Sequence, residues 1–149
     1  MIRRDQSAFS KSLSMETKKT VIIVPSETKS IRMVSFKLLE AIKPYGVSED
    51  TLYDIRLCTE EAVRNAIVHG NLSDVHLLTT VSYWIEEDKI FIEVEDEGVG
   101  FDRGNLPDPT TDDNILKSFG RGVYLIEKLM DSARFNQSGN KITMTKKIK

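Results

Sequence analysis

The chain has 149 residues, enough for one domain that can build a hydrophobic core without disulfides. Hydrophobic residues make up 40% and charged residues 30% of the sequence, which excludes a wholly disordered chain. A formal net charge of -2 gives no sign of a nucleic-acid partner, and no apolar run approaches the ~20 residues of a membrane span. The one cysteine, Cys58, cannot form an internal disulfide, and these features together indicate a cytoplasmic protein.

The beginning of the chain predicts a tail, a strand and a helix. Residues 1–19 are polar and aperiodic, so we interpret them as an N-terminal tail before a single domain at residues 20–149. The β-branched run at residues 20–24 predicts a strand. Ser26 is the expected N-cap of the following helix, which should end near Pro44 because the residue before a proline resists the α conformation.

A long central helix is predicted from Ser48, a second expected N-cap, to Gly70, a residue after which helices commonly stop. Glu61, Asn65 and His69 are each four residues apart on this helix, so they form one slowly drifting polar stripe. Apolar residues recur at steps of three and four, the spacing of one buried face. They are Leu52, Ile55, Cys58, Ala62, Ala66 and Ile67.

The second half of the chain predicts a hairpin, a loop, a helix and two closing strands. Residues 77–86 and 90–95 should pair as an antiparallel hairpin, since the connection between them is short. Residues 101–119 have little apolar content and are expected to form a functional loop, after which a helix should begin at Gly120. The predicted fold is α+β, a two-layer sandwich of a mostly antiparallel sheet with helices on one face. The closing strands are expected at residues 134–136 and 142–145.

The polar stripe of the central helix suits a bound cation. A carboxylate at Glu61 and a carboxamide at Asn65, among apolar neighbours, are costly to bury unless each finds a partner. Mg²⁺ prefers oxygen ligands and keeps several waters, so one amide oxygen together with phosphates can hold it. The alternative is a polar row that is simply solvated, and His69 would then lie near the helix C-terminus for the helix dipole.

Two glycine-containing segments could bind different parts of a nucleotide. Asp96 ends a strand and precedes Gly98 and Gly100, so its carboxylate could accept a hydrogen bond from a base whose plane approaches the glycine backbone. Gly120 and Gly122 at a helix start would offer free backbone amides to an anion. Taken singly, each segment could also be an ordinary turn or helix cap.

In their order along the chain, the three segments resemble the N box and the two glycine boxes of the GHKL ATPase and kinase superfamily. The closer resemblance is to the anti-sigma-factor serine/threonine kinases of the RsbW type, which pair a segment like Glu61–Gly70 with one like Gly120–Ile126. It covers roughly residues 20–146 and implies the histidine-kinase-like ATPase fold, also called the Bergerat fold. No Walker A sequence is present, so a P-loop fold is not predicted.

The resemblance implies roles for the residues that match the first two boxes. Glu61 would be the general base toward the attacking hydroxyl group, and Asn65 would hold Mg²⁺. Asp96 would bind the amino group of adenine, while Gly98 and Gly100 would shape the base pocket.

The second glycine box carries the remaining implied roles. Gly120 and Gly122 would meet the phosphates of ATP at the helix N-terminus, with Arg121 nearby, and residues 101–119 would form a lid over the nucleotide. The family often has a threonine on a late strand near the adenine. Here Thr143 falls on the opposite face by strand alternation, so it receives no role.

The resemblance also implies a biological role. It indicates an ATP-dependent and Mg²⁺-dependent serine/threonine kinase that acts as an anti-sigma factor, binds a sigma factor and phosphorylates an anti-anti-sigma partner of the STAS type. A homodimer is expected, without direct contact to nucleic acid or membrane. The alternative is a non-catalytic, nucleotide-gated binding module, but Glu61 favours the kinase because a pure binder needs no base beside the metal. A sensor histidine kinase is disfavoured, since residues 1–19 contain no histidine to accept a phosphate.

Overall fold

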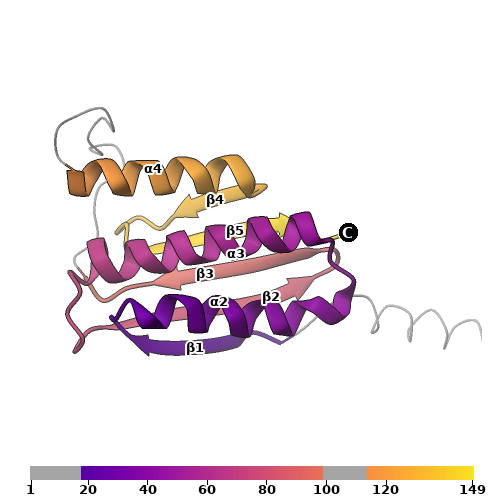
Figure 1. Ribbon diagram of the computed structural model, residues 1–149, viewed down its shortest axis with the longest axis horizontal. Coiled ribbons are helices and arrows are strands. Elements are labelled where there is room, and N and C mark those ends of the chain that lie inside the picture. The colour runs from indigo at the N-terminus through magenta and orange to yellow at the C-terminus, as the bar shows by residue number, and fades with distance from the viewer. Residues whose placement is uncertain (1–17, 99–113) are drawn as a thin grey trace, which may run out of the picture.

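The computed structural model describes residues 18–98 and 114–149. These residues form one five-stranded sheet in the order β1-β2-β3-β5-β4, and every neighbouring pair is antiparallel. Helices α2, α3 and α4 lie on one face of the sheet, with α3 between the other two (Figure 1). The predicted α+β two-layer sandwich is therefore confirmed. Most of the predicted tail, Gly100 and residues 101–113 of the predicted lid lie outside the described residues.

The elements follow the predicted order with small shifts at their ends. The predicted hairpin is present, because Glu86 pairs with Lys89 and Glu87 takes the left-handed φ of 55° that suits a two-residue connection. The strands are β1 (Thr20–Pro25), β2 (Leu78–Glu86), β3 (Lys89–Glu95), β4 (Ser132–Phe135) and β5 (Lys141–Lys147). The helices are α2 (Lys29–Ile42), α3 (Glu49–Arg64) and α4 (Asn114–Leu129), with the 3₁₀-helix η1 (Lys43–Tyr45) after α2 and the π-helix η2 (Asn65–Gly70) after α3.

The hydrophobic core lies between the sheet and the three helices. Ile90, Ile92 and Val94 alternate along β3 and are at most 2% exposed, so they carry the dry face of the sheet. Burying each such side chain contributes roughly 1.5–3 kcal/mol. Cys58 is also fully buried, and desolvation raises the pKa of its thiol to about 12, so it acts as a small apolar core residue. The helices contribute Val34, Leu38, Ile55, Val63, Ile67 and Ile126 to this core.

The two predicted helix caps have different outcomes. Ser48 is the N-cap of α3, where its Oγ accepts a hydrogen bond from the Thr51 N–H at 3.2 Å, as predicted. The prediction for Ser26 is wrong, because the N-cap of α2 is Thr28. The Ser26 hydroxyl instead donates to the carbonyl of Leu77 at 2.7 Å. This partner lies 51 residues away along the chain, a contact that local spacing could not reveal.

The central helix changes its winding in its last turn. The sequence predicts one α-helix to Gly70, but α3 ends at Arg64 and the π-helix η2 continues to Gly70. The Asn71 N–H donates to the carbonyl of Ala66 at 2.8 Å, five residues back, as π geometry requires. Single π turns within helices occur frequently at functional sites. Within residues 18–98 and 114–149, no helix is both long and apolar enough to cross a bilayer.

The last helix begins earlier than predicted. The prediction of a helix start at Gly120 is wrong, because α4 already begins at Asn114 and contains Gly120, Arg121 and Gly122 in its interior. In an α-helix only the first four N–H groups lack a partner within the helix. The amides of Gly120 and Gly122 therefore point along the helix and are not free to receive an anion in this conformation.

This assignment predicts slow amide exchange in the second glycine box. In the protein without nucleotide, the amides of Gly120, Arg121 and Gly122 should exchange at least tenfold more slowly than those of an unstructured peptide, because each is bonded within α4. Hydrogen exchange followed by NMR measures this directly. Exchange at the peptide rate would instead show that the helix begins at Gly120.

Candidate functional site

Glu61 and Asn65 lie where the central helix changes from α to π geometry. Asn65 is the first residue of η2 and is only 9% exposed, while Glu61 lies in the last turn of α3. The Oε1 atom of Glu61 accepts a hydrogen bond from Nη1 of Arg64 at 2.9 Å. The Arg64 side chain is 44% exposed, so this ion pair is screened by water and can open at little cost.

Gly122 brings α4 against this polar pair. A Cβ atom built on Gly122 would lie 2.7 Å from Oε2 of Glu61 and 3.3 Å from Nδ2 of Asn65. Both distances are shorter than ordinary van der Waals contact, so the two helices approach this closely only because residue 122 has no side chain. The structure thus brings together three of the predicted site residues, from the N box and the second glycine box.

Asp96 lies directly after β3 and is 8% exposed. Its Oδ1 accepts a hydrogen bond from the Gly98 N–H at 2.9 Å, which closes a tight turn. The carboxyl group faces the end of η2, where a Cβ atom on Gly70 would lie 2.2 Å from Oδ2. A Cβ atom on Gly98 would lie 1.9 Å from the carbonyl oxygen of Gly70. Two glycines therefore permit a direct approach of the helix end to the strand end.

The Asp96 carboxyl is held in a dry environment. Its pKa is raised from 3.8 to about 6, chiefly because burial desolvates the carboxylate. The hydrogen bond from Gly98 opposes this rise, and the charge of Glu95 adds to it. A carboxylate that is buried without a cationic partner is costly for a fold to keep. Strongly perturbed carboxyl groups of this kind are concentrated at functional sites.

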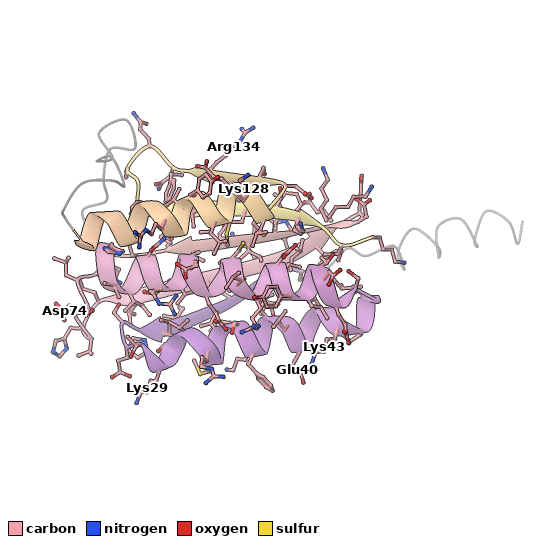
Figure 2. The ribbon with its side chains drawn as sticks, turned by 45° about the horizontal axis from the view of Figure 1, so that its top comes forward. Lys29, Glu40, Lys43, Asp74, Lys128 and Arg134 are labelled. Atoms are coloured by element: carbon pink, nitrogen blue, oxygen red, sulfur yellow. The ribbon has the colours of Figure 1, made fainter. Side chains whose placement is uncertain are left out.

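The π-helix η2 connects the two parts of the site. Its first residue, Asn65, lies beside Glu61 and Gly122, and its last residue, Gly70, touches Asp96. The loop after Gly70, marked by Asp74, lies at the same end of the molecule as the start of α2 at Lys29 (Figure 2). The site is thus at one end of the helical layer. Gly120 is half-buried, Arg121 is exposed, and Gly100 lies outside the described residues.

Sequence reasoning missed the part that Gly70 and Asn71 play. The sequence predicts Gly70 as a helix stop, whereas its contact shows that the absent side chain makes room for Asp96. Asn71, which is 1% exposed, accepts a hydrogen bond from the Glu97 N–H at 2.9 Å. The available signal was an asparagine directly after a helix-ending glycine, but such a pair also occurs in ordinary turns.

His69 and Thr143 do not join the polar groups of the site. The ring of His69 packs edge-on against Phe119, with the ring centroids 5.3 Å apart, and burial lowers its pKa. A neutral imidazole gains little from the helix dipole, so the predicted dipole role is not supported. Thr143 donates to Oε2 of Glu93 at 3.4 Å on the uncovered face of the sheet, opposite the buried Ile142 and Met144, as alternation predicts.

The donor set limits how a cation could be held. Among residues 18–98 and 114–149, no group of three His, Cys, Asp or Glu side chains could bind a metal ion by itself. The amide of Asn65 and the carboxylate of Glu61 offer oxygen atoms of the kind that Mg²⁺ accepts. A cation here would have to take most of its ligands from water and from a bound phosphate chain, and the residues fit that arrangement.

Comparison with known proteins identifies the fold family of this site. The histidine kinase-like ATPase domain family matches residues 24–146, which include every described residue of the site. The chain belongs to this family. Serine-protein kinase RsbW of Staphylococcus aureus strain JH9 is 31% identical over 134 residues, which are 85% of this chain and 84% of the relative. The protein of the same name from strain RF122 is equally similar.

A solved structure also has this fold. The crystal structure of the RsbU and RsbW domains of a Mycobacterium tuberculosis protein superposes with a TM-score of 0.61 at 22% identity. The match covers 87% of this chain and 31% of that longer one. The position of the Glu61, Asn65 and Asp96 side chains is therefore set by a histidine kinase-like ATPase domain.

The raised pKa of Asp96 predicts a pH-dependent cost to stability. The folded protein holds this proton up to about pH 6 whereas the unfolded chain releases it near pH 3.8, so stability falls as the pH rises through this window. Asp96→Asn keeps the acceptor for Gly98 and removes the buried charge. We expect it to raise the free energy of unfolding by roughly 1–3 kcal/mol at pH 8 and not at pH 4.

Urea denaturation at the two pH values measures this difference. Glu86→Gln, a change at an exposed acid at the opposite end of the hairpin, is the control and should show no such pH dependence. A gain from Asp96→Asn that is equal at both pH values would contradict the buried-charge explanation.

Proposed function

We propose that the protein is an ATP-dependent serine/threonine protein kinase that acts as an anti-sigma factor and phosphorylates an anti-anti-sigma protein with a STAS domain. Two findings support this proposal: membership of the histidine kinase-like ATPase domain family, and relatives named serine-protein kinase RsbW that match over most of their length. The observation that carries it is the position of Glu61, whose carboxylate lies against Gly122 and beside the amide of Asn65.

The residues divide the work between base and phosphates. Asp96 accepts a hydrogen bond from the amino group of adenine, and Gly98 and Gly100 let the base approach the backbone. Asn65 holds Mg²⁺, which neutralises the charge of the phosphate chain when bound. This division agrees with the position of η2, which has the buried Asp96 carboxyl at its last residue and the Glu61 and Asn65 oxygens at its first.

Glu61 acts on the protein substrate. Its carboxylate accepts the proton of a serine or threonine hydroxyl, whose oxygen forms a bond to the γ-phosphorus of ATP while ADP leaves. Arg64 holds this carboxylate at 2.9 Å, and the exposed position of the arginine lets the pair separate when substrate arrives.

Phosphate binding requires a rearrangement at the start of α4. Gly120 and Gly122 lie inside the helix, so their amides become available to phosphates only if the helix unwinds as far as Gly120. Glycine is about 1 kcal/mol less favourable than alanine in a helix interior, and two glycines make this place easy to open. Arg121 is exposed at the same place, where its charge suits a phosphate chain.

A non-catalytic, nucleotide-gated binding module is the second candidate. The ion pair between Glu61 and Arg64 favours it, because the arginine occupies one oxygen of the carboxylate that an incoming hydroxyl group would need. In this reading the bound nucleotide would favour binding of a partner, and no phosphate would be transferred.

The partners and setting follow from the same proposal. The protein works in the cytoplasm, binds a sigma factor and its STAS-domain substrate, and does not contact nucleic acid or membrane. It forms a homodimer, for which β1 offers a suitable edge strand with Val21 52% and Ile23 59% exposed. Sedimentation of the purified protein at micromolar concentration tests the dimer.

Incubation with labelled ATP tests the kinase directly. The protein is mixed with Mg²⁺, ATP labelled at the γ-phosphate and purified candidate STAS-domain proteins, and the label should appear on a serine or threonine of one of them. Binding to such a protein that depends on nucleotide, without any transfer, would favour the gated module.

Asp96→Asn should weaken nucleotide binding. Loss of a buried charged acceptor typically costs about 1–3 kcal/mol, which is roughly a 5- to 150-fold rise in the Kd of Mg-ATP. The affinity of the wild-type protein should also fall below about pH 6, because protonated Asp96 is a weaker acceptor than the carboxylate and presents a hydroxyl donor instead. Isothermal titration calorimetry measures both effects, with Glu86→Gln as control. A wild-type protein that binds no nucleotide at millimolar concentration would refute the proposal.

Glu61→Gln should separate chemistry from binding. Removing a general base typically lowers the rate about 10²–10⁴-fold, while the affinity for ATP should change little because phosphates and adenine are held elsewhere. The matched control is Glu60→Gln, since the neighbouring glutamate accepts a hydrogen bond from Ser35 at 2.7 Å and not from Arg64. Single-turnover transfer measures the rate. An unaltered rate in Glu61→Gln would exclude it as the base.

A further inference from the structure

The side chain of Asn71 is the centre of a buried polar network. It follows η2 directly and is 1% exposed, and its two neighbours Ser26 and Thr79 are equally buried. Its Nδ2 atom lies 2.8 Å from Oγ of Ser26, 3.0 Å from the carbonyl oxygen of Leu78 and 3.3 Å from Oγ1 of Thr79. Its Oδ1 atom accepts from the Glu97 N–H at 2.9 Å.

The neighbours determine which way this amide points. The Ser26 hydroxyl gives its one proton to the carbonyl of Leu77 at 2.7 Å, so toward Asn71 it can only accept. The Leu78 carbonyl can only accept as well, while the Glu97 N–H can only donate. The amide nitrogen must therefore face Ser26, and the amide oxygen must face Glu97.

The hydrogen bond to Glu97 falls within the turn that carries Asp96. The Asp96 N–H donates to the carbonyl of Asn140 at 2.9 Å, and Nδ2 of Asn140 donates back to the Asp96 carbonyl at 3.1 Å. The Glu97 N–H donates to Oδ1 of Asn71, and the Gly98 N–H donates to Oδ1 of Asp96 itself. The peptide group before Asp96 is thus bonded to the backbone of Asn140, and the one after it to the side chains of Asn71 and Asn140. We call this pair of asparagines, which come from distant parts of the chain, the clasp.

We propose that Asn71 is a positioning residue that, together with Asn140, orients the Asp96 carboxyl toward the exocyclic group of the bound base and so sets the preference for adenine. This assignment rests on the proposed nucleotide site. A carboxylate can discriminate an amino group from a carbonyl oxygen only if its direction is fixed, because a mobile carboxylate would turn away from the unfavourable oxygen. The fixed direction comes from the asparagines and not from Asp96 alone.

ATP and inosine triphosphate separate positioning from simple stability. They share ribose and phosphates but differ at position 6, where ATP has an amino group and inosine triphosphate has an oxygen, and at the adjacent N1, which carries a hydrogen only in inosine triphosphate. We expect the wild-type protein to bind Mg-ATP at least tenfold more tightly than the inosine nucleotide. In Asn71→Ala the Kd of ATP should rise about tenfold, while the Kd of the inosine nucleotide should change less than twofold.

Two further variants make the comparison decisive. Asn140→Ala removes the side-chain hydrogen bond to the Asp96 carbonyl and keeps the backbone one. It lies at a half-buried turn, so it tests the same ratio even if Asn71→Ala does not fold, and it should reduce the ratio at least threefold. Ser35→Ala removes a part-buried hydrogen bond of 2.7 Å to Glu60, away from Asn71 and Asn140. It should lower the melting temperature and leave both affinities unchanged.

The outcomes are distinct. Affinities for the two nucleotides that fall in parallel, or an unchanged ratio in both asparagine variants, would overturn the positioning role while leaving the nucleotide site intact. A wild-type protein that binds neither nucleotide would overturn the proposed function, and the positioning role with it.

Discussion

The close contact between the end of the central helix and the end of β3 is the constraint on which the site depends. A side chain on Gly98 would meet the carbonyl oxygen of Gly70 at 1.9 Å, and one on Gly70 would meet Asp96 at 2.2 Å. No rotamer change relieves a clash with a backbone oxygen, so any larger residue at 98 must move the strand end or the helix end. Because η2 runs from Asn65 to Gly70, this contact also fixes where Asn65 lies relative to Asp96. It therefore sets the two halves of the site relative to each other.

The second close contact, between α4 and α3, has a different character. A side chain on Gly122 would meet the far end of the Glu61 side chain, which can move, and Asn65 at 3.3 Å, which is buried. The contact is thus easier to rearrange than the one between Gly70 and Gly98. In the proposed nucleotide site, a rigid contact at the Asp96 end would hold adenine in one orientation, and a yielding one at Glu61 and Asn65 would admit the phosphates by movement of α4.

Local chemistry explains which features could be predicted from the sequence. The alternation of Ile90, Ile92 and Val94 determines which face of β3 is buried, and the Ser48 cap acts within one turn, so both predictions are correct. The fold and the grouping of Glu61 with Asn65 follow from spacing of this kind. The bond from Ser26 to Leu77 spans 51 residues, and the π winding of η2 shows itself in a backbone bond from Asn71 to Ala66, so neither leaves a local pattern. The prediction of a helix start at Gly120 was wrong. Two glycines usually weaken a helix, but here Gly122 packs on α3 and both glycines are helical.

In the proposed nucleotide site, the burial of Asp96 would set stability against binding. Its carboxyl is only 8% exposed, and desolvation raises its pKa to about 6, so near neutral pH the free protein keeps a charge that water would stabilise better. An asparagine at this position would keep the bond to Gly98 and remove the cost, but its amide could turn either its oxygen or its nitrogen toward a base. A carboxylate can only accept, which makes it selective for an amino group. A buried charge that is costly to keep aids recognition only when its direction is fixed. The hydrogen bonds that Asn71 and Asn140 make to the turn of Asp96 would provide this fixed direction.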